Sequence, residues 1–260
     1  MNICKIQQHV IDWESVGGYE KFMADYQAAT AYSDRRLLIE SLPLYTNPEW
    51  LAARRGHITA SKMKDFLGMD RSGKNPGAGY KKVVKQLVAE EFGWEEAEST
   101  WNEKASIKRG LLFEARAREL FEKETGIKLK TDIGFVSEMI KDMPFGCSPD
   151  AYADDTQGNF GCLCEIKSFE LCRLQDELET LHSVDIMEQM QAQMAICNCP
   201  RAYKVLYSPE LDKIFYLKYT RAMSFMPRLL DRIEIAQKYR EQMRHNLLNY
   251  TDLTDKIMED

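Results

Sequence analysis

The sequence predicts an α/β protein in which a mixed central β-sheet is flanked by helices. Helical patterns occupy both ends of the chain, short β-like runs lie in its middle, and a further helix separates the last two of those runs from the rest. This order of elements is typical of an α/β sandwich. A chain of 260 residues with 44% hydrophobic content can bury a substantial core, so we expect one domain that is extended at both ends.

The N-terminal part is expected to be a helical extension of the core. Residues 18–42 have helical composition without an internal breaker, and Pro43 and Pro48 then punctuate the chain. The C-terminal helix is expected to pack on the core or on a neighbouring subunit. The three expected regions, namely extension, core and helical tail, are residues 1–47, 48–220 and 221–260.

Within the core, a helical segment at residues 59–68 begins at Thr59, a candidate N-cap, and ends at Gly68. A loop rich in glycine and lysine, RSGKNPGAG, follows it. Further helices are expected at residues 80–92, 107–124 and 184–197. Strands are expected at residues 129–137, 144–153, 161–167, 202–208 and 213–219.

Composition and charge narrow the classes of protein. The chain has no run of about 18 apolar residues and a polar start, so we expect neither a membrane span nor a signal peptide, and a location in a bacterial host cytosol. Seven cysteines, an odd number, suit reduced thiols, and the Cys and His spacings do not fit a zinc site. The net charge of −6 argues against a protein that coats nucleic acid, so any contact with DNA must be local.

The most informative pattern is the tripeptide SPD ending at Asp150, followed after a short loop by EIK from Glu165 to Lys167. Side chains alternate along a strand, so Glu165 and Lys167 are expected on one face and their apolar neighbours on the other. This alternation also assigns the C-x-C pair that precedes Glu165 to the core.

An aspartate on one strand and a glutamate on its hairpin partner can converge on a hard divalent cation, which prefers oxygen ligands. Such a cation polarises a scissile phosphate and acidifies a water, and a lysine beside that water stabilises the developing charge. The pattern therefore indicates phosphodiester hydrolysis without a covalent intermediate. Because the string D-x(n)-E-x-K is common by chance, a surface hairpin with solvated charges is the alternative.

The helix expected at residues 184–197 supports this interpretation. Its methionines form a stripe within about 80° of arc, and Gln191 falls inside that stripe. Gln191 is therefore expected to point inward, whereas Gln189 and Gln193 are expected in solvent. A buried glutamine bonded to main chain is the alternative.

Glu114 lies on the shoulder of the apolar stripe of the helix at residues 107–124. From there it could reach a metal or its water at the edge of the core. The alternative is an ordinary i,i+4 ion pair with Arg118.

Five motifs in this order resemble the lambda exonuclease and YqaJ-like viral recombinase family. They are W-x-x-x-R-x-G-x-I-T-A-S at residues 50–61, G-x-x-x-E at 110–114, S-P-D at 148–150, E-x-K at 165–167 and Q-x-Q at 189–191. The resemblance covers residues 50–219. It implies a PD-(D/E)XK (restriction-endonuclease-like) core with the mixed sheet already expected.

The resemblance implies an Mg²⁺-dependent 5′-to-3′ exonuclease that acts on double-stranded DNA and leaves 3′ single-stranded overhangs for phage-type homologous recombination. Asp150 and Glu165 would hold Mg²⁺, with two ions per site and Mn²⁺ as a substitute, and Lys167 would activate the attacking water. The residues at the family's catalytic and metal-binding positions are Asp150, Glu165, the main-chain carbonyl of Ile166, Lys167, Glu114 and Gln191.

The family also binds the 5′-terminal phosphate of its substrate in a positive pocket. An arginine offers paired donors to a phosphate, and hydroxyls at a helix start complete such a site. The matching residues are Arg54, Thr59 and Ser61, with Lys62 and Ser148 as further DNA contacts. A plain surface arginine is the alternative for Arg54. Residues 54–85 contain nine basic and two acidic side chains, so this segment is expected to form a local basic patch in a chain of negative net charge.

Relatives of this kind form a ring-shaped trimer around duplex DNA and work with a single-strand annealing protein. The resemblance thus implies DNA ends, copies of this chain and an annealing protein as partners, and no membrane. The segment before Trp50 and the loop between Asp150 and Glu165 look longer than in the lambda enzyme, which leaves ring geometry open. Three alternatives stay open: another PD-(D/E)XK DNA endonuclease, a RecB-like nuclease, and a catalytically silent DNA-end-binding protein.

Overall fold

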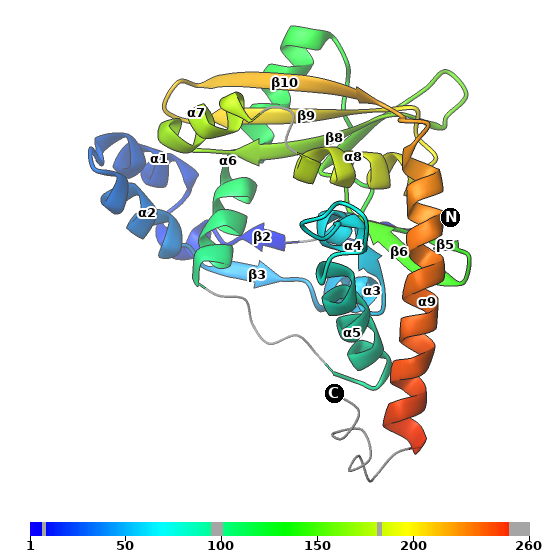
Figure 1. Cartoon of the computed structure of the whole chain (residues 1–260). Helices are drawn as coiled ribbons and strands as arrows, with labels where there is room; N and C mark the ends of the chain where they lie inside the picture. Colours follow the sequence, from blue (N-terminus) through cyan, green and yellow to red (C-terminus); the bar gives the residue numbers. More distant parts are fainter. Residues whose placement is uncertain (7–8, 95–100, 181–183, 250–260) are drawn as a thin grey trace.

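The computed structural model describes residues 1–6, 9–94, 101–180 and 184–249. Most strands in these ranges belong to two four-stranded mixed sheets. In the first, here called the main sheet, β8 and β9 run parallel, while the outer strands β7 and β10 are antiparallel to them (Figure 1). The strands, in the order β10–β9–β8–β7, are Lys213–Thr220, Arg201–Ser208, Phe160–Ser168 and Ala151–Asp154. The predicted mixed sheet is confirmed.

The second sheet has the order β1–β5–β6–β4, in which only β4 and β6 are parallel. Its strands are Asn2–Cys4, Phe135–Ile140, Met143–Cys147 and Ile58–Thr59, and a separate pair is formed by β2 (His9–Ile11) and β3 (Leu44–Thr46). The single strand expected at residues 144–153 is two strands in different sheets, β6 and β7. Pro149 lies between them, where its missing N–H interrupts strand pairing.

Helices cover both faces of the main sheet (Figure 1). Helix α6 packs on β8, β9 and β10, and α8 packs on the opposite face, between the sheet and α4. The α-helices are α1 (Tyr19–Ala28), α2 (Tyr32–Glu40), α3 (Pro48–Arg54), α4 (Met63–Leu67), α5 (Gly79–Glu91), α6 (Trp101–Thr125), α7 (Leu171–Glu179), α8 (Val184–Ile196) and α9 (Phe225–Asn249). Two 3-10 turns are η1 (Glu14–Val16) and η2 (Ala60–Lys62). None of the helices in the described ranges is long and apolar enough to cross a membrane.

Strand β8 is buried on both faces, and its side chains alternate between two hydrophobic clusters. Cys164 and Ile166 pack with Phe113 and other residues of α6, whereas Leu163 packs with Met190 and other residues of α8. The predicted alternation is therefore confirmed. Since Glu165 has the parity of Leu163, its side chain leaves β8 on the side of α8.

The N-terminal part differs from the single helical segment expected at residues 18–42. Helices α1 and α2 are separated at Ala29, whose backbone is extended and whose carbonyl accepts a 2.9 Å hydrogen bond from Arg35 Nε. Strand β1 also adds an edge to the second sheet by pairing with β5. The break has no local sequence signal, because residues 29–31 contain no glycine or proline. The pairing of β1 with β5 has none either, because it joins segments more than a hundred residues apart.

Helix α3 was not among the expected elements, although its start has a recognisable signal. The Asn47 side chain accepts hydrogen bonds from the main-chain N–H of Glu49 at 2.9 Å and of Trp50 at 3.2 Å. Pro48 occupies the first turn, where its missing donor is harmless. This cap fixes the orientation of the helix that carries Trp50 and Arg54.

Candidate active site

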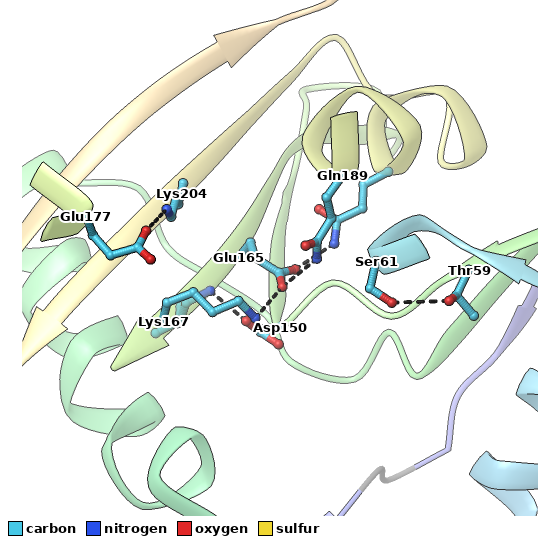
Figure 2. Close-up of polar contacts among 10 residues, drawn as sticks. Thr59, Ser61, Asp150, Glu165, Lys167, Glu177, Gln189 and Lys204 are labelled. Atoms are coloured by element: carbon cyan, nitrogen blue, oxygen red, sulfur yellow. Dashed lines mark hydrogen bonds and ion pairs between the residues drawn. The ribbon is translucent and has the colours of Figure 1, made fainter. Parts of the chain in front are cut away.

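Asp150 and Glu165 come together because β7 and β8 form a hairpin. Asp150 directly precedes β7, and its main-chain N–H donates to the carbonyl of Cys164 at 3.1 Å. Its carboxylate Oδ2 accepts a 2.6 Å hydrogen bond from the main-chain N–H of Ile166 (Figure 2). The hairpin thus places the two acids of the motif next to each other, with the Asp150 carboxylate aimed along β8.

Glu165 is held by three side-chain donors (Figure 2). Its Oε1 accepts from Lys167 Nζ at 2.6 Å and from Gln189 Nε2 at 2.7 Å, and its Oε2 accepts from Gln193 Nε2 at 2.6 Å. Glu165 is only 5% exposed, so this network fixes the carboxylate in one orientation.

The packing prediction for Gln191 is wrong, and so is the prediction that Gln189 and Gln193 are solvated. Gln191 bonds instead to the carbonyl of Thr220 and the N–H of Ala222, both at 2.8 Å, in the connection from β10 to α9. Gln193 is 1% exposed. The physical reason is that α8 is enclosed by the main sheet on one side and α4 on the other, so its methionine stripe does not mark the only buried side.

The hydrogen-bond pattern of α8 instead identifies Gln189 and Gln193 as the glutamines that meet the acidic motif. They are four residues apart and share one helix face, which lies over Glu165. The available sequence signal was the i,i+4 repeat of amide side chains on a helix that follows the E-x-K strand.

Glu114 fits both readings of its position on α6. Its Oε1 lies 3.4 Å from Arg118 NH1, which is the expected i,i+4 pair. It also lines the same cavity as Asp150, Glu165 and Lys167. Burial raises the pKa of Glu114, and the nearby Glu165 raises it further, while Arg118 lowers it.

Negative charge is concentrated at this site. Burial raises the pKa of Asp150 well above its ordinary value, and Glu165 and Glu114 add to that rise, while Lys167 opposes it. Burial disfavours the charge on Lys167, but Glu165 and Asp150 outweigh burial and raise its pKa. Three carboxylates therefore share the space with the Lys167 ammonium, which is an environment that favours an additional cation.

These residues fit a divalent metal by their chemistry. The donors are carboxylate oxygens, the type that Mg²⁺ prefers, and their mutual repulsion is relieved by a bound cation. In the part of the chain that the structure describes, no three His, Cys, Asp or Glu side chains already form a metal-binding group, and the Glu165 carboxylate is bonded to Lys167 and the two glutamines. A cation bound by Glu165 would therefore compete with Lys167 and the glutamines for the oxygens of the Glu165 carboxylate.

A second cluster lines the same cavity, which has a volume of about 1380 Å³. The Arg54 guanidinium stacks on Trp50 at 4.2 Å from the ring centroid, and Trp50 Nε1 donates to Ser148 Oγ at 3.2 Å. Thr59 Oγ1 and Ser61 Oγ lie 3.1 Å apart (Figure 2). The cluster of Arg54, Trp50, Thr59, Ser61 and Ser148 is here called the hydroxyl–arginine cluster, and all five residues line the cavity.

Lys62 does not belong to the hydroxyl–arginine cluster, although it follows Ser61 directly. Its Nζ donates to Gln86 Oε1 on α5 at 2.6 Å, and it does not line the cavity. Thr59, the candidate N-cap of the following turn, makes no side-chain capping bond, so its hydroxyl is directed to Ser61 instead. The structure therefore brings together every sequence-predicted site residue except Gln191 and Lys62.

Comparison with known proteins agrees with this geometry. The model of the YqaJ-like viral recombinase domain matches residues 49–200. No curated protein matches the chain. Among solved structures, an alkaline exonuclease (LHK-Exo) from Laribacter hongkongensis is 23% identical, with a TM-score of 0.62 over 77% of this chain and 96% of that one.

Two further structures are similar. LHK-Exo in complex with dAMP is 24% identical, with a TM-score of 0.61 over 77% of this chain and 96% of that one. A phage related exonuclease from Haemophilus somnus 129PT is 15% identical, with a TM-score of 0.57 over 74% of this chain and 96% of that one. At these identities the likeness shows the fold, which is the PD-(D/E)XK fold expected from the motifs.

Proposed function

The chain belongs to the family of YqaJ-like viral recombinase domains, and from this premise we propose that it is an Mg²⁺-dependent 5′-to-3′ exonuclease on double-stranded DNA. The observation that carries the proposal is the convergence of Asp150, Glu165 and Lys167 in a cavity that Arg54 also lines. A site for phosphodiester cleavage and a site for a terminal phosphate thus share one cavity, as an enzyme that starts from an end requires.

Asp150 and Glu165 would hold Mg²⁺, together with the main-chain carbonyl of Ile166, and Glu114 would assist a second ion. The ions would stabilise charge on the scissile phosphate and acidify the attacking water, and Mn²⁺ would substitute for Mg²⁺. The support is the donor set, in which burial and the neighbouring Glu165 raise the pKa of both Asp150 and Glu114, while Lys167 opposes that rise.

Lys167 stabilises the negative charge that develops on the phosphate, since its ammonium is already fixed beside Glu165 at 2.6 Å. Gln189 and Gln193 hold the Glu165 carboxylate in orientation and so act as positioning residues. In the reaction, water adds to phosphorus, its proton passes to a base, and the bond from phosphorus to the 3′ oxygen breaks. That oxygen takes up a proton, and a 5′-mononucleotide leaves.

The hydroxyl–arginine cluster is the proposed pocket for the 5′-terminal phosphate. Arg54 would donate to the phosphate, and the hydroxyls of Thr59, Ser61 and Ser148 would complete the set of donors. Stacking on Trp50 holds the Arg54 guanidinium, and Trp50 is bonded in turn to Ser148, two residues before Asp150. The pocket is thereby held at a fixed place relative to the acids.

Arg54→Ala is expected to reduce the preference for 5′-phosphorylated over 5′-hydroxyl ends by roughly tenfold or more, because hydrogen bonds to a charged group contribute about 1.5–3 kcal/mol. The measurement is the initial rate of digestion on matched duplexes that differ only in end chemistry. Arg244→Ala, a change of an exposed arginine on α9 outside the basic segment, is the control and should leave the preference unchanged. An unaltered preference in Arg54→Ala would remove the proposed pocket.

Gln189→Ala is expected to lower the single-turnover cleavage rate by about 10- to 100-fold, as is typical when a residue that orients a metal ligand is removed. Gln191→Ala, on the same helix and with the same chemical change, should alter the rate by less than about twofold. Equal losses in the two variants would show that the contact between Gln189 and Glu165 has no special role.

The rest of the proposal concerns the product and the partners. Digestion of one strand from each 5′ end leaves 3′ overhangs, the substrate of a single-strand annealing protein in recombination, and copies of this chain would form a ring around the duplex. The basic side chains from Arg54 to Lys85, Lys62 included, would contact the DNA backbone locally. Exposed lysines of this segment on α4 and α5 are Lys64, Lys81, Lys82 and Lys85.

The direct test is digestion of linear duplexes in which each strand is labelled separately. Release of mononucleotides from the 5′-ended strand, dependent on Mg²⁺, is the expected result. Cutting of covalently closed circular DNA would favour an endonuclease instead. Tight binding to ends without release of nucleotides would favour a silent DNA-end-binding protein.

A further inference from the structure

A buried ion pair lies beside the proposed metal site and has no part in the mechanism above. Lys204, on β9, is 2% exposed, and its Nζ lies 3.1 Å from Glu177 Oε2 on α7 (Figure 2). Both residues line the same cavity as Glu165 and Lys167. A lysine this deeply buried needs a counter-charge nearby, and in this structure Glu177 supplies it.

Lys204 has a second acid within reach. In the parallel pairing of β8 with β9, Glu165 and Lys204 are register partners. Adjacent strands lie about 4.8 Å apart, so side chains of paired residues stand next to each other on one face. That this face is shared is shown by Leu163 and Ala202, which are also register partners and belong to the same hydrophobic cluster.

A second ammonium on Glu165 would conflict with metal binding. The Glu165 carboxylate already accepts from Lys167, Gln189 and Gln193, and each oxygen has about two acceptor positions. Another cation there would occupy remaining acceptor capacity. It would also place positive charge where a divalent cation has to bind.

We propose that Glu177 is a positioning residue that holds Lys204 away from Glu165 and thereby keeps Glu165 available to the divalent cation. This inference rests on the proposed function, because it assigns Glu177 a role toward the metal of that same site. Glu177 pairs with Lys204 from the α7 side, so a carboxylate balances the positive charge of Lys204 on the face of β9 next to the site.

The test is Mn²⁺ binding by the full chain without DNA, measured as loss of the electron paramagnetic resonance signal of free Mn²⁺. Glu177→Gln keeps the shape of the side chain but removes its charge, and we expect the dissociation constant for Mn²⁺ to rise about tenfold or more. The double variant Glu177→Gln/Lys204→Met removes both charges and is expected to return within about twofold of the original protein. Glu179→Gln, at the exposed end of the same helix, is the matched control and should not change affinity.

Lys204→Met alone leaves Glu177 without its lysine and should bind Mn²⁺ at least as tightly as the original protein. If Glu177→Gln binds normally, or if the double variant is as weak as Glu177→Gln, the pair is only a tie between α7 and the sheet and the proposal is overturned. Weaker binding by Lys204→Met alone overturns it as well, and this arm stands even if Glu177→Gln fails to fold. Absence of Mn²⁺ binding by the original protein would refute the metal-dependent function itself, which is a different outcome from normal binding by Glu177→Gln.

Discussion

Lys167→Ala is expected to abolish cleavage while leaving binding to DNA ends intact. The Lys167 ammonium lies 2.6 Å from Glu165, and its side chain lines the cavity, where it can meet the phosphate. A preorganised donor at a developing charge contributes about 10²–10³-fold to turnover, so a loss of this size or larger is expected. Because alanine also removes a positive charge from beside three carboxylates, Mn²⁺ binding should be retained or tightened.

The measurements are single-turnover cleavage and fluorescence anisotropy with an end-labelled duplex, in parallel with Mn²⁺ binding. Lys128→Ala, a change of an exposed lysine paired with Glu122 far from the motif, is the control and should behave as the original protein. Residual cleavage within about tenfold of the original rate would contradict the assigned role. Loss of Mn²⁺ binding would instead point to damage to the site as a whole.

Asp150→Asn is expected to eliminate metal-dependent activity, by about three orders of magnitude or more, since metal assistance supplies several kcal/mol of transition-state stabilisation. Asparagine keeps an oxygen that can accept from the Ile166 N–H, so the hairpin should stay intact. The change therefore separates the charge of Asp150 from its structural hydrogen bond. Measured rates at saturating Mg²⁺ test this, with Asp154→Asn on β7 as the control.

The same variant should stabilise the metal-free protein. Burial, and then Glu165 and Glu114, raise the pKa of Asp150 in the folded chain above its value in the unfolded chain. The folded state therefore binds more protons in the window between the two values, and stability falls as pH rises through it. We expect Asp150→Asn to have the higher melting temperature at neutral pH, and the difference to vanish below about pH 4. Equal melting temperatures at neutral pH would contradict the destabilisation that we assign to burial of the Asp150 charge and its repulsion by Glu165 and Glu114.

Local patterns predicted the hairpin that carries the acidic motif and the extent of α8, but not which face of α8 lies over the motif. The alternation in β8 and the SPD tripeptide identified Asp150, Glu165 and Lys167, because a two-residue repeat is a local property. The phase of α8 predicted Gln191 in place of Gln189, because hydrophobicity marks burial and cannot say which of two buried sides faces the site. The contact of Lys204 with Glu177 was missed for a related reason, since the pairing of β8 with β9 is set by tertiary structure.

The N-terminal elements also differ in whether the local sequence contains a signal for them. Helix α3 was missed, although Asn47 and Pro48, a cap and a first-turn residue, are a local signal for its start. The break at Ala29 and the pairing of β1 with β5 depend on partners more than a hundred residues away or on a single side-chain contact. Such features are decided by packing, which a local pattern does not report.

The two clusters that line the cavity are held together by hydrogen bonds of very different sequence separation. The side-chain hydrogen bonds of Asp150 and Glu165 span 2 to 28 residues, whereas the bond from Trp50 to Ser148 spans 98. Closing a longer loop costs more conformational entropy, so the contact between Trp50 and Ser148 carries the larger entropic cost. A molecule that lost this contact would release α3 with Arg54 while the hydrogen bonds between Asp150, Glu165 and α8 stayed in place.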